Sequence, residues 1–445
     1  MFNRRIVNYL KEWKDKKNRK PLVLRGARQV GKTSAVKIFA RECFEHFVYI
    51  NLESAKDFEV FKDVNTLDDF ERITDVVFGK EIIAGSTLIF IDEIQNAPNL
   101  IELLRFFYEE KPSLHIVVAG SLLDVKIEKQ GLTMPVGRIE YAYVFPLTFF
   151  EFLEAIKEEK LLYFLRDCDI KSKIPAAIHR RALDFFQEYA LIGGMPEAVA
   201  LYQQKKWRKE INTVYSSLLT AYNEDIYKYS SAADVKYVSY ALEQAPYFAG
   251  ERIVYEKFGG SVYKSREMGD AFEVLEKAML LNQIRTTKSV DLPLIKQEKR
   301  SKKLLYLDVG LVNFKNNIQV KFLQIKDLND LYRGKIAEQV VGQNLIADKV
   351  NMAQTLFYWA RERDKSSAEV DFCLVSKGKI IGIEVKSGHS MKLRSLFSFG
   401  DSVKNSVLIR VYSGELKIED IIYARKKYKL ISVPFYLVNN IKKMV

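Results

Sequence analysis

The sequence of 445 residues has few cysteines, few histidines and no long apolar run. Its three cysteines (Cys43, Cys168 and Cys373) lie far apart and its four histidines are scattered, so we expect neither a disulfide framework nor a zinc motif. The apolar runs are as long as strands, well short of the roughly 18 residues that a membrane helix needs, so no membrane partner is expected. Because the start, MFNRRIVNYLKEW, also lacks the features of a signal peptide, we expect a cytoplasmic protein.

Acidic residues are fewer than basic ones, with 57 Asp and Glu against 70 Lys and Arg, which gives a net charge of +13. The basic residues recur in short clusters such as KEWKDKKNRK, IKQEKRSKK and ARKKYK. A basic surface attracts polyanions, so nucleic acid is a natural partner, although any single cluster is better explained as solvated lysine on a loop. The length and the 48% hydrophobic content are typical of a globular protein with about two to four domains.

The stretch PLVLRGARQVGKTSAVKIF has the spacing G-x-x-x-x-G-K-[ST] from Gly26 to Thr33. A short apolar strand precedes it and a helical pattern follows, which is the context of a phosphate-binding loop. The glycines let successive N–H groups turn toward a phosphate, and the helix adds its positive N-terminal dipole. We expect Lys32 at the β- and γ-phosphates and the Thr33 hydroxyl on Mg²⁺. The predicted nucleotide-binding residues of this loop are Gly26, Ala27, Arg28, Gln29, Val30, Gly31, Lys32, Thr33 and Ser34.

The run TLIFIDE indicates a buried central strand that ends in Asp92 and Glu93. Next to a phosphate-binding loop, Asp92 is expected in the water shell of Mg²⁺ and Glu93 as the general base that polarises the attacking water. The segment FVYINLE, residues 47–53, is expected as the strand inserted between the phosphate-loop strand and the acidic strand. That insertion marks P-loop ATPases with their own catalytic glutamate, so the sequence predicts an ATPase with ATP and Mg²⁺ as cofactors.

The motifs LRGARQVGKT, FIDEIQ, AGSLL and VGRIEYAYVFPLTFFEFL resemble the AAA+ superfamily. More closely, the chain resembles prokaryotic AAA-family ATPases with a C-terminal nuclease-like domain of unknown function, which LIGGMPEAV and YLDVGL also match. The resemblance covers essentially the whole chain and implies that Ser121 senses the γ-phosphate. Arg138, at the start of a further strand, either completes the site of a neighbouring subunit in a homo-oligomer, as an arginine finger, or forms a structural salt bridge.

The middle of the chain divides into two patterns. Residues 148–210 have helical spacing, which predicts a helical lid over the nucleotide, with a glycine turn before Pro196. Within 211–303, short helices over 235–250 and 251–260, a third helix from residue 265 and two strands around a basic loop predict a winged helix-turn-helix. Such a module either reads DNA or serves as a protein-docking spacer. Its candidate DNA contacts are Lys264, Arg266, Lys299, Arg300, Lys302 and Lys303.

The stretch AEVDFCLVSKGKIIGIEVKSG indicates two strands joined by a glycine-containing turn. Glu384 and Lys386 are two residues apart, so both point to one face of their strand, and Asp371 lies on the paired strand. This D…ExK pattern is that of the restriction-endonuclease-like fold, and GKIAEQVVGQNLI adds Glu338 from a preceding helix. Asp371 and Glu384 are expected to hold Mg²⁺, with Glu338 extending the metal shell, and Lys386 is expected to position water or to stabilise the developing charge. Charges on the wet face of a sheet are the alternative.

The sequence therefore predicts an α/β protein with a P-loop AAA+ parallel sheet, a helical lid, a winged helix-turn-helix and a restriction-endonuclease-like domain. The expected limits are 1–147, 148–210, 211–303 and 304–445. The expected function is ATP hydrolysis coupled to DNA engagement, with cleavage by the C-terminal domain left open. The alternative is an ATP-switched binding or scaffold protein whose nuclease-like domain does not cleave.

Overall fold

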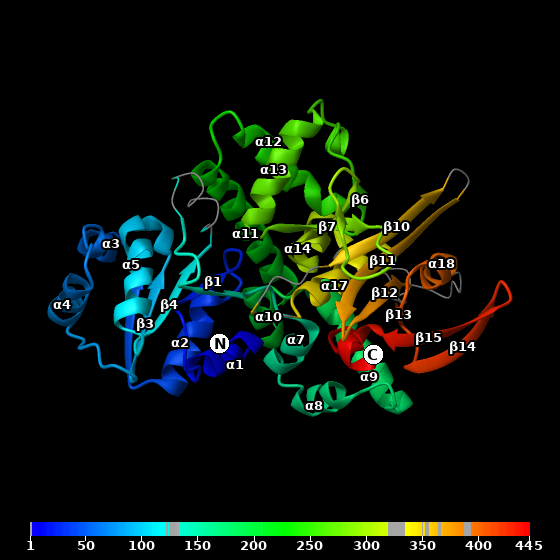
Figure 1. Ribbon diagram of the computed structural model, residues 1–445, viewed down its shortest axis with the longest axis horizontal. Helices are drawn as coiled ribbons and strands as arrows, with labels where there is room; N and C mark the ends of the chain where they lie inside the picture. Colours follow the sequence, from blue (N-terminus) through cyan, green and yellow to red (C-terminus); the bar gives the residue numbers. More distant parts are fainter. Residues whose placement is uncertain are drawn as a thin grey trace.

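The computed structural model describes residues 2–121, 123, 131, 133–205, 207–318, 334–348, 350–351, 356–363, 366–386 and 393–445 (Figure 1). Of the motifs quoted above, Leu122 and residues 387–388 lie outside the described residues. A small sheet lies at one end of the molecule and a larger one at the other, with helices between them (Figure 1). Among the described residues, no helix is both long enough and apolar enough to cross a membrane.

The first sheet has five parallel strands in the order β2-β3-β4-β1-β5. Their bounds are β1 (Leu22–Arg25), β2 (His46–Asn51), β3 (Thr87–Asp92), β4 (His115–Gly120) and β5 (Glu140–Tyr143). Helices cover both faces, and their bounds are α1 (Arg5–Lys14), α2 (Lys32–Cys43), α3 (Ala55–Phe61), α4 (Leu67–Phe78) and α5 (Pro98–Glu110). Leu88 and Phe90 of β3 belong to the core with α1 and α2, whereas Ile89 and Ile91 belong to the core with α3 to α5. The central strands are therefore apolar on both faces.

The sheet corrects the predicted place of the strand at residues 47–53. That strand, β2, pairs with β3 at the edge of the sheet, and β4 is the strand inserted between β1 and β3. The burial patterns agree with this order: β4 is buried at all six positions, whereas only two of the six residues of β2 are buried. The order of strands along the chain is thus not their order in the sheet.

The second sheet has ten strands, in the order β14-β15-β13-β12-β11-β10-β7-β9-β6, with β8 paired to β7. Their bounds are β6 (Arg252–Ile253), β7 (Leu281–Thr287), β8 (Lys296–Gln297), β9 (Lys302–Tyr306), β10 (Phe357–Arg363), β11 (Ser366–Ser376), β12 (Lys379–Val385), β13 (Ser406–Tyr412), β14 (Lys417–Tyr423) and β15 (Lys426–Pro434). The parallel pair β7–β10 joins the middle of the chain to its C-terminal part. The predicted limit between 303 and 304 falls inside β9. The four domain limits remain predictions.

The remaining helices lie between and around the two sheets (Figure 1). The α-helices are α7 (Phe149–Ala155), α8 (Glu159–Asp167), α9 (Ala176–Ile192), α10 (Pro196–Gln203), α11 (Trp207–Tyr229), α12 (Val235–Gln244), α13 (Ser265–Lys277), α14 (Val309–Lys315), α17 (Lys335–Ile346) and α18 (Arg394–Ser402). The 3-10 helices are η1 (Ile94–Asn96), η2 (Ala245–Phe248), η3 (Phe258–Gly260) and η4 (Phe435–Met444). Where the sequence predicts a short helix over 251–260, the structure has β6 and η3, because Arg252 and Ile253 pair with β9.

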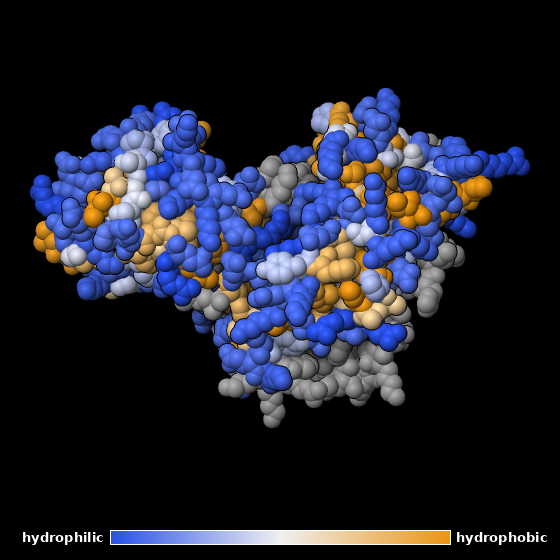
Figure 2. Space-filling model, turned by 90° about the horizontal axis from the view of Figure 1, so that it is seen from below, coloured by the Kyte–Doolittle hydropathy of each residue, from blue (hydrophilic) through white to orange (hydrophobic). Residues whose placement is uncertain are grey.

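The helices predicted to form the lid pack in two directions. On α9, the ring of Phe186 stacks on that of Phe435 with 5.7 Å between centroids, and His179 Nδ1 lies 2.8 Å from the Tyr436 hydroxyl. The helix α10 instead lies at the loop between β1 and α2, where Pro196, Glu197 and Ala200 line the same cavity as the loop. Of the helices predicted to form the lid, α10 lies at the loop and α9 packs on the C-terminal part, and the lid itself stays a prediction. On the face shown in Figure 2, hydrophilic residues cover most of the surface and apolar residues gather in small groups.

Candidate nucleotide site and C-terminal acidic cluster

The loop between β1 and α2 has the backbone that its glycines allow. Gly31 has a φ of 95°, in the region that favours glycine, and it directly precedes the first residue of α2. At Gly26 a Cβ atom would lie 2.4 Å from the Val144 carbonyl oxygen, so only glycine fits there. The loop therefore opens onto the N-terminus of α2, where N–H groups and the helix dipole favour an anion.

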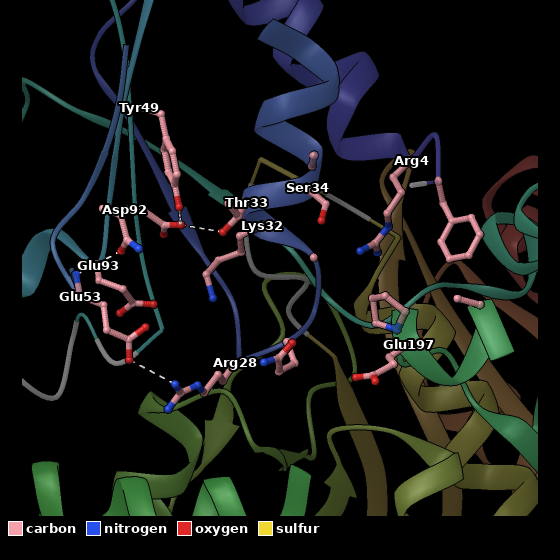
Figure 3. A pocket seen from close by; sticks show the side chains of 17 residues that line it. Arg4, Arg28, Lys32, Thr33, Ser34, Tyr49, Glu53, Asp92, Glu93 and Glu197 are labelled. Carbon is pink, nitrogen blue, oxygen red and sulfur yellow. Dashed lines mark hydrogen bonds and ion pairs between the residues drawn. The ribbon is translucent and has the colours of Figure 1, made fainter. Parts of the chain in front are cut away.

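A cavity of about 530 Å³ lies in front of this loop (Figure 3). Its lining joins the loop and β3 to the N-terminal segment and α10. The lining residues are Phe2, Arg4, Arg28, Gln29, Gly31, Lys32, Thr33, Ser34, Ala35, Tyr49, Asn51, Glu53, Asp92, Glu93, Pro196, Glu197 and Ala200. Three of the predicted loop residues do not line the cavity: Gly26, Ala27 and Val30. The side chains of Ala27 and Val30 are buried in the core.

Lys32 is buried, and its ammonium Nζ donates hydrogen bonds to the carbonyl oxygens of Gly26 at 2.9 Å and Ala27 at 3.0 Å. Burial lowers the pKa of this ammonium, and the charges of Glu93 and Asp92 oppose that shift. The two acceptors are neutral carbonyls, so a phosphate would give the ammonium a stronger, charge-assisted partner.

Thr33 and Asp92 meet at the end of β3. The Thr33 hydroxyl donates to Asp92 Oδ2 at 2.6 Å, and the Tyr49 hydroxyl donates to the same oxygen at 3.4 Å (Figure 3). Burial raises the pKa of the Asp92 carboxyl, and burial together with Asp92 raises the pKa of Tyr49 to about 12. A hydroxyl and a carboxylate oxygen in one place are hard oxygen donors of the kind Mg²⁺ takes, so the residues fit that ion.

Glu93 follows Asp92 with a φ of 55°, a left-handed conformation that is uncommon for glutamate. Its Oε2 accepts a hydrogen bond from the Ser121 hydroxyl at 3.2 Å and another from the Gln95 side chain. Glu93 lies between the cavity at Lys32 and a neighbouring one of about 440 Å³ that Ser121 and Asp225 line. Ser121 therefore contacts the carboxylate of Glu93 and lies outside the first cavity.

Two arginines at the cavity form contacts that the sequence analysis missed. Arg4 Nη1 donates to the Val30 carbonyl at 2.6 Å, and its Nε lies 3.3 Å from Glu151 Oε1. Arg28 Nη1 lies 3.0 Å from both carboxylate oxygens of Asp225 on α11. Because the partners lie far apart in the chain, no local motif could have indicated these contacts.

Arg138 lies outside both cavities at the phosphate-binding loop. Its Nε lies 2.7 Å from Glu109 Oε1 at the end of α5, and its side chain is 42% exposed. It precedes β5, which begins at Glu140, so the prediction that Arg138 opens the strand was wrong by two residues. Within one chain, Arg138 forms a surface ion pair.

The predicted D…ExK residues come together on the second sheet. Asp371 lies on β11, Glu384 on β12 and Glu338 on α17. Asp371 Oδ2 accepts the backbone N–H of Val385 at 2.8 Å, and Lys386 Nζ lies 2.7 Å from Glu384 Oε1. Burial raises the pKa of Glu384 to about 7 and that of Glu338 to about 8.

Lys303, predicted as a DNA contact, is part of this cluster. Its side chain is only 2% exposed, and Nζ lies 2.6 Å from Glu338 Oε2 and 3.2 Å from Asp371 Oδ1. Burial acts to lower the pKa of this ammonium, but the carboxylates of Asp371, Glu338 and Glu369 outweigh it and raise the pKa above its usual range. The DNA-contact prediction for Lys303 was wrong because this lysine faces the interior.

The three carboxylates as arranged do not fit the predicted metal. Among the described residues, no group of three or more His, Cys, Asp or Glu side chains could hold a metal ion. The position between Glu338 and Asp371 is taken by the Lys303 ammonium.

The other basic residues of the middle segment remain at the surface to different degrees. Lys264, Arg266 and Lys299 are exposed, and Arg300 is partly exposed. Lys302 Nζ donates to the Tyr255 hydroxyl at 2.9 Å. The exposed cations lie at the start of α13 and in the segment between β8 and β9.

Three family models match the chain. Residues 18–153 match the AAA domain, residues 183–321 a domain of unknown function (DUF8612) and residues 333–435 another domain of unknown function (DUF4143). No curated protein matches the sequence.

The solved structures that resemble the chain do so distantly. C. elegans PCH-2 has 14% identity and a TM-score of 0.25, over 45% of this chain and 59% of that one. The Thermotoga maritima RuvB Holliday junction branch migration motor has 18% identity and a TM-score of 0.30, over 67% and 93%. The Aeropyrum pernix ORC1 protein in complex with DNA has 12% identity and a TM-score of 0.26, over 72% and 92%. Likenesses this low carry no conclusion about partners. The parallel sheet, the phosphate-binding loop and the family match identify residues 18–153 as a P-loop domain of the AAA family.

Proposed function

We propose that this chain binds ATP with Mg²⁺ in the cavity before α2 and hydrolyses it. The observation that supports this most directly is the contact between Thr33 and Asp92, beside Lys32 and Glu93 in one cavity. These four side chains supply a cation for the phosphates, two oxygens for a divalent ion and a carboxylate for the attacking water. The AAA match over residues 18–153 supports the same activity.

The side chains would work as follows. The Lys32 ammonium would exchange its two carbonyl partners for β- and γ-phosphate oxygens, while the loop N–H groups hold the rest of the polyphosphate. Thr33 and Asp92 would hold Mg²⁺, which supplies charge neutralisation at the phosphates. Glu93 would accept a proton from the attacking water. Its bonds to Ser121 and Gln95 would keep that carboxylate in place.

Replacement of Glu93 by glutamine tests this proposal, because glutamine keeps the size of the side chain and removes the base. Glu93→Gln should bind ATP with nearly unchanged affinity and lose phosphate release by roughly a hundredfold or more. Glu102→Gln, an exposed change on α5, is the matched control and should turn over normally. Wild-type turnover in Glu93→Gln would place the base elsewhere.

We further propose that the middle segment engages DNA. Its helices α12 and α13 with the strands β6, β9 and β7 have the content of a winged helix-turn-helix, and Lys264, Arg266 and Lys299 are exposed on it. The preceding helix α11 carries Asp225, which contacts Arg28 of the phosphate-binding loop. Through this contact, nucleotide binding could alter the position of the middle segment.

Anisotropy of a labelled DNA duplex tests this second proposal. The combined change of Lys264, Arg266 and Lys299 to alanine should weaken binding and lower its salt dependence. The combined change of Lys17, Lys56 and Lys379, which are exposed elsewhere, removes the same charge and is the control. Equal weakening by both sets would show attraction by net charge alone.

For the C-terminal segment we propose a restriction-endonuclease-like fold that does not cleave. Two observations support the fold. The elements follow one another in the order α17, β10, β11, β12, α18 and β13, and the three carboxylates of the predicted motif lie on α17 (Glu338), β11 (Asp371) and β12 (Glu384). The buried Lys303 supports the absence of cleavage.

A further inference from the structure

The Lys303 ammonium lies at the centre of the C-terminal acidic cluster. Besides its contacts with Glu338 at 2.6 Å and Asp371 at 3.2 Å, Nζ lies 3.3 Å from Glu369 Oε1. Three carboxylates from α17 and β11 therefore share one cation that comes from β9. An ammonium donates at most three hydrogen bonds, so this set of partners can use all of them.

The other carboxylate charges of the cluster also have cation partners. Glu384 pairs with Lys386 at 2.7 Å, and Glu369 pairs with Arg252 of β6 at 3.2 Å. Four carboxylates thus face three cations within the described residues. A divalent metal site usually keeps an excess of negative charge to offset the ion, and this cluster has little excess left.

Lys303 Nζ occupies the position between the facing oxygens of Glu338 and Asp371. Mg²⁺ binds oxygens at about 2.1 Å and Ca²⁺ at about 2.3 to 2.6 Å. An ion bound by Glu338 Oε2 and Asp371 Oδ1 would take the same two oxygens that Lys303 Nζ contacts at 2.6 and 3.2 Å. Two cations so close in a buried site would repel each other strongly.

Lys303 is also held in place by its strand. The strand β9 pairs with β7 on one side and with β6 on the other. The ammonium lies 5.4 Å from the centre of the Phe372 ring and 5.9 Å from that of Tyr358, so the surroundings of Nζ are aromatic as well as ionic. The strand pairing fixes the backbone of Lys303, and the ionic and aromatic contacts hold its ammonium.

We propose that Lys303 serves as the built-in cation of this cluster and takes the place of a divalent metal between Glu338 and Asp371. The cluster is then an ionic joint between β9 and the C-terminal segment, and no phosphodiester is cleaved there. This proposal deepens the non-cleaving function proposed above, and it rests on the contacts of Lys303.

Manganese binding by the full-length protein tests the proposal. Titrations are made without nucleotide and with Asp92→Asn present in every variant, so that the ATP cavity contributes no metal site and failure of the ATPase proposal would not affect the result. With Lys303 intact, calorimetry and Mn²⁺ resonance should show no specific binding at millimolar Mn²⁺. One bound Mn²⁺ that Asp371→Asn removes would overturn the proposal.

Lys303→Met tests whether removal of the ammonium opens a metal site, because methionine is similar in length and carries no charge. It should gain a Mn²⁺ site at least roughly tenfold tighter than any binding before the change, about 1.4 kcal/mol, and Asp371→Asn should abolish that gain. A folded Lys303→Met that binds no better would overturn the proposal.

A second measurement decides the matter if Lys303→Met does not fold. Protein with Lys303 intact is incubated with plasmid DNA and Mn²⁺, and nicking is compared with that by Asp371→Asn. Equal, background nicking supports the proposal. Nicking that Asp371→Asn removes overturns it.

Discussion

Arg4 and Glu151, 147 residues apart in the chain, form a buried ion pair with 3.3 Å between Nε and Oε1. Their side chains are 7% and 5% exposed. The same guanidinium donates to the Val30 carbonyl of the phosphate-binding loop. The Glu151 carboxylate accepts the backbone N–H of Thr148, which caps the N-terminus of α7. One arginine therefore holds the N-terminal segment, the loop and the first helix after the sheet together.

The first prediction concerns the stability that this pair provides. Burial acts to raise the pKa of Glu151, but Arg4 and the Thr148 N–H outweigh it and lower the pKa. Arg4→Met would leave a buried carboxylate without its cation, so we expect a loss of roughly 3 to 5 kcal/mol in urea unfolding. Arg5→Met, whose pair with Asp348 is more exposed, is the control and should cost about 1 kcal/mol or less. Equal losses would contradict this interpretation.

The second prediction is loss of nucleotide binding in Lys32→Ala. The ammonium would form charge-assisted hydrogen bonds to phosphate, so we expect affinity for a fluorescent ATP analogue to fall by roughly 3 kcal/mol, more than a hundredfold. Lys37→Ala, an exposed change on the same helix, controls for charge. Unchanged affinity in a folded Lys32→Ala would place the phosphates elsewhere.

The third prediction concerns the contact between Arg28 and Asp225. Arg28 Nη1 faces both oxygens of the Asp225 carboxylate, so the losses of unfolding free energy in Arg28→Ala and Asp225→Ala should not be additive. We expect a coupling of roughly 1 kcal/mol in a double-mutant cycle of urea unfolding. A double-mutant cycle of Arg105 and Glu109, an exposed pair within α5, is the comparison and should show a smaller coupling free energy. A coupling near zero would mean that α11 is not tied to the loop through this pair.

The fourth prediction tests Arg138 as an arginine finger. The pair with Glu109 is exposed and contributes little to stability, so Arg138→Ala should fold normally. If the guanidinium completes a site in a neighbouring subunit, the variant should lose ATP turnover, and mixing it with Glu93→Gln should restore part of it. Normal turnover of Arg138→Ala alone would limit this arginine to its surface pair.

The fifth prediction is a pH dependence of stability from Asp308. Its carboxylate accepts hydrogen bonds from the N–H groups of Gly194 at 2.7 Å and Gly310 at 2.9 Å. Burial nevertheless raises its pKa from 3.8 to about 6. The folded state then binds the proton more tightly than the unfolded state, so this contribution is complete below pH 3.8 and is lost as the pH rises through about 6.

Urea unfolding between these pH values checks the sign. The stability of the wild type relative to Asp308→Asn should increase as the pH falls, by up to about 3 kcal/mol, because asparagine cannot take up the proton. A difference that stays constant with pH would show that Asp308 titrates normally.

The sequence predicted those parts of the site that lie within one segment. Lys32 and Thr33 line the cavity because a strand, a loop and a helix follow one another in one segment, and Glu93 joins them from the end of a second predicted segment, the buried strand β3. The order of the strands could not be predicted, since β2 precedes β3 along the chain yet lies at the edge.

Lys303 shows the same limit at the second site. In KKLLY, neighbouring residues point to opposite faces of the strand, and only the packed structure decides which lysine is inside. Lys302 faces Tyr255, whereas Lys303 meets carboxylates 35 and 68 residues further along the chain. No pattern within the basic segment distinguishes the two lysines.

The pairing of β7 with β10 has a consequence for how this protein can be divided. A fragment that begins at residue 334 would lose β7 and β9, so β10 would become an open edge with unpaired N–H and C=O groups. It would also keep Glu338 and Asp371 without the ammonium between them. Such a fragment would tend to associate through the exposed edge of β10. Any cation that it bound would reflect the loss of Lys303 and not a property of the intact protein. The half of the chain from β6 onward is therefore best handled as one piece.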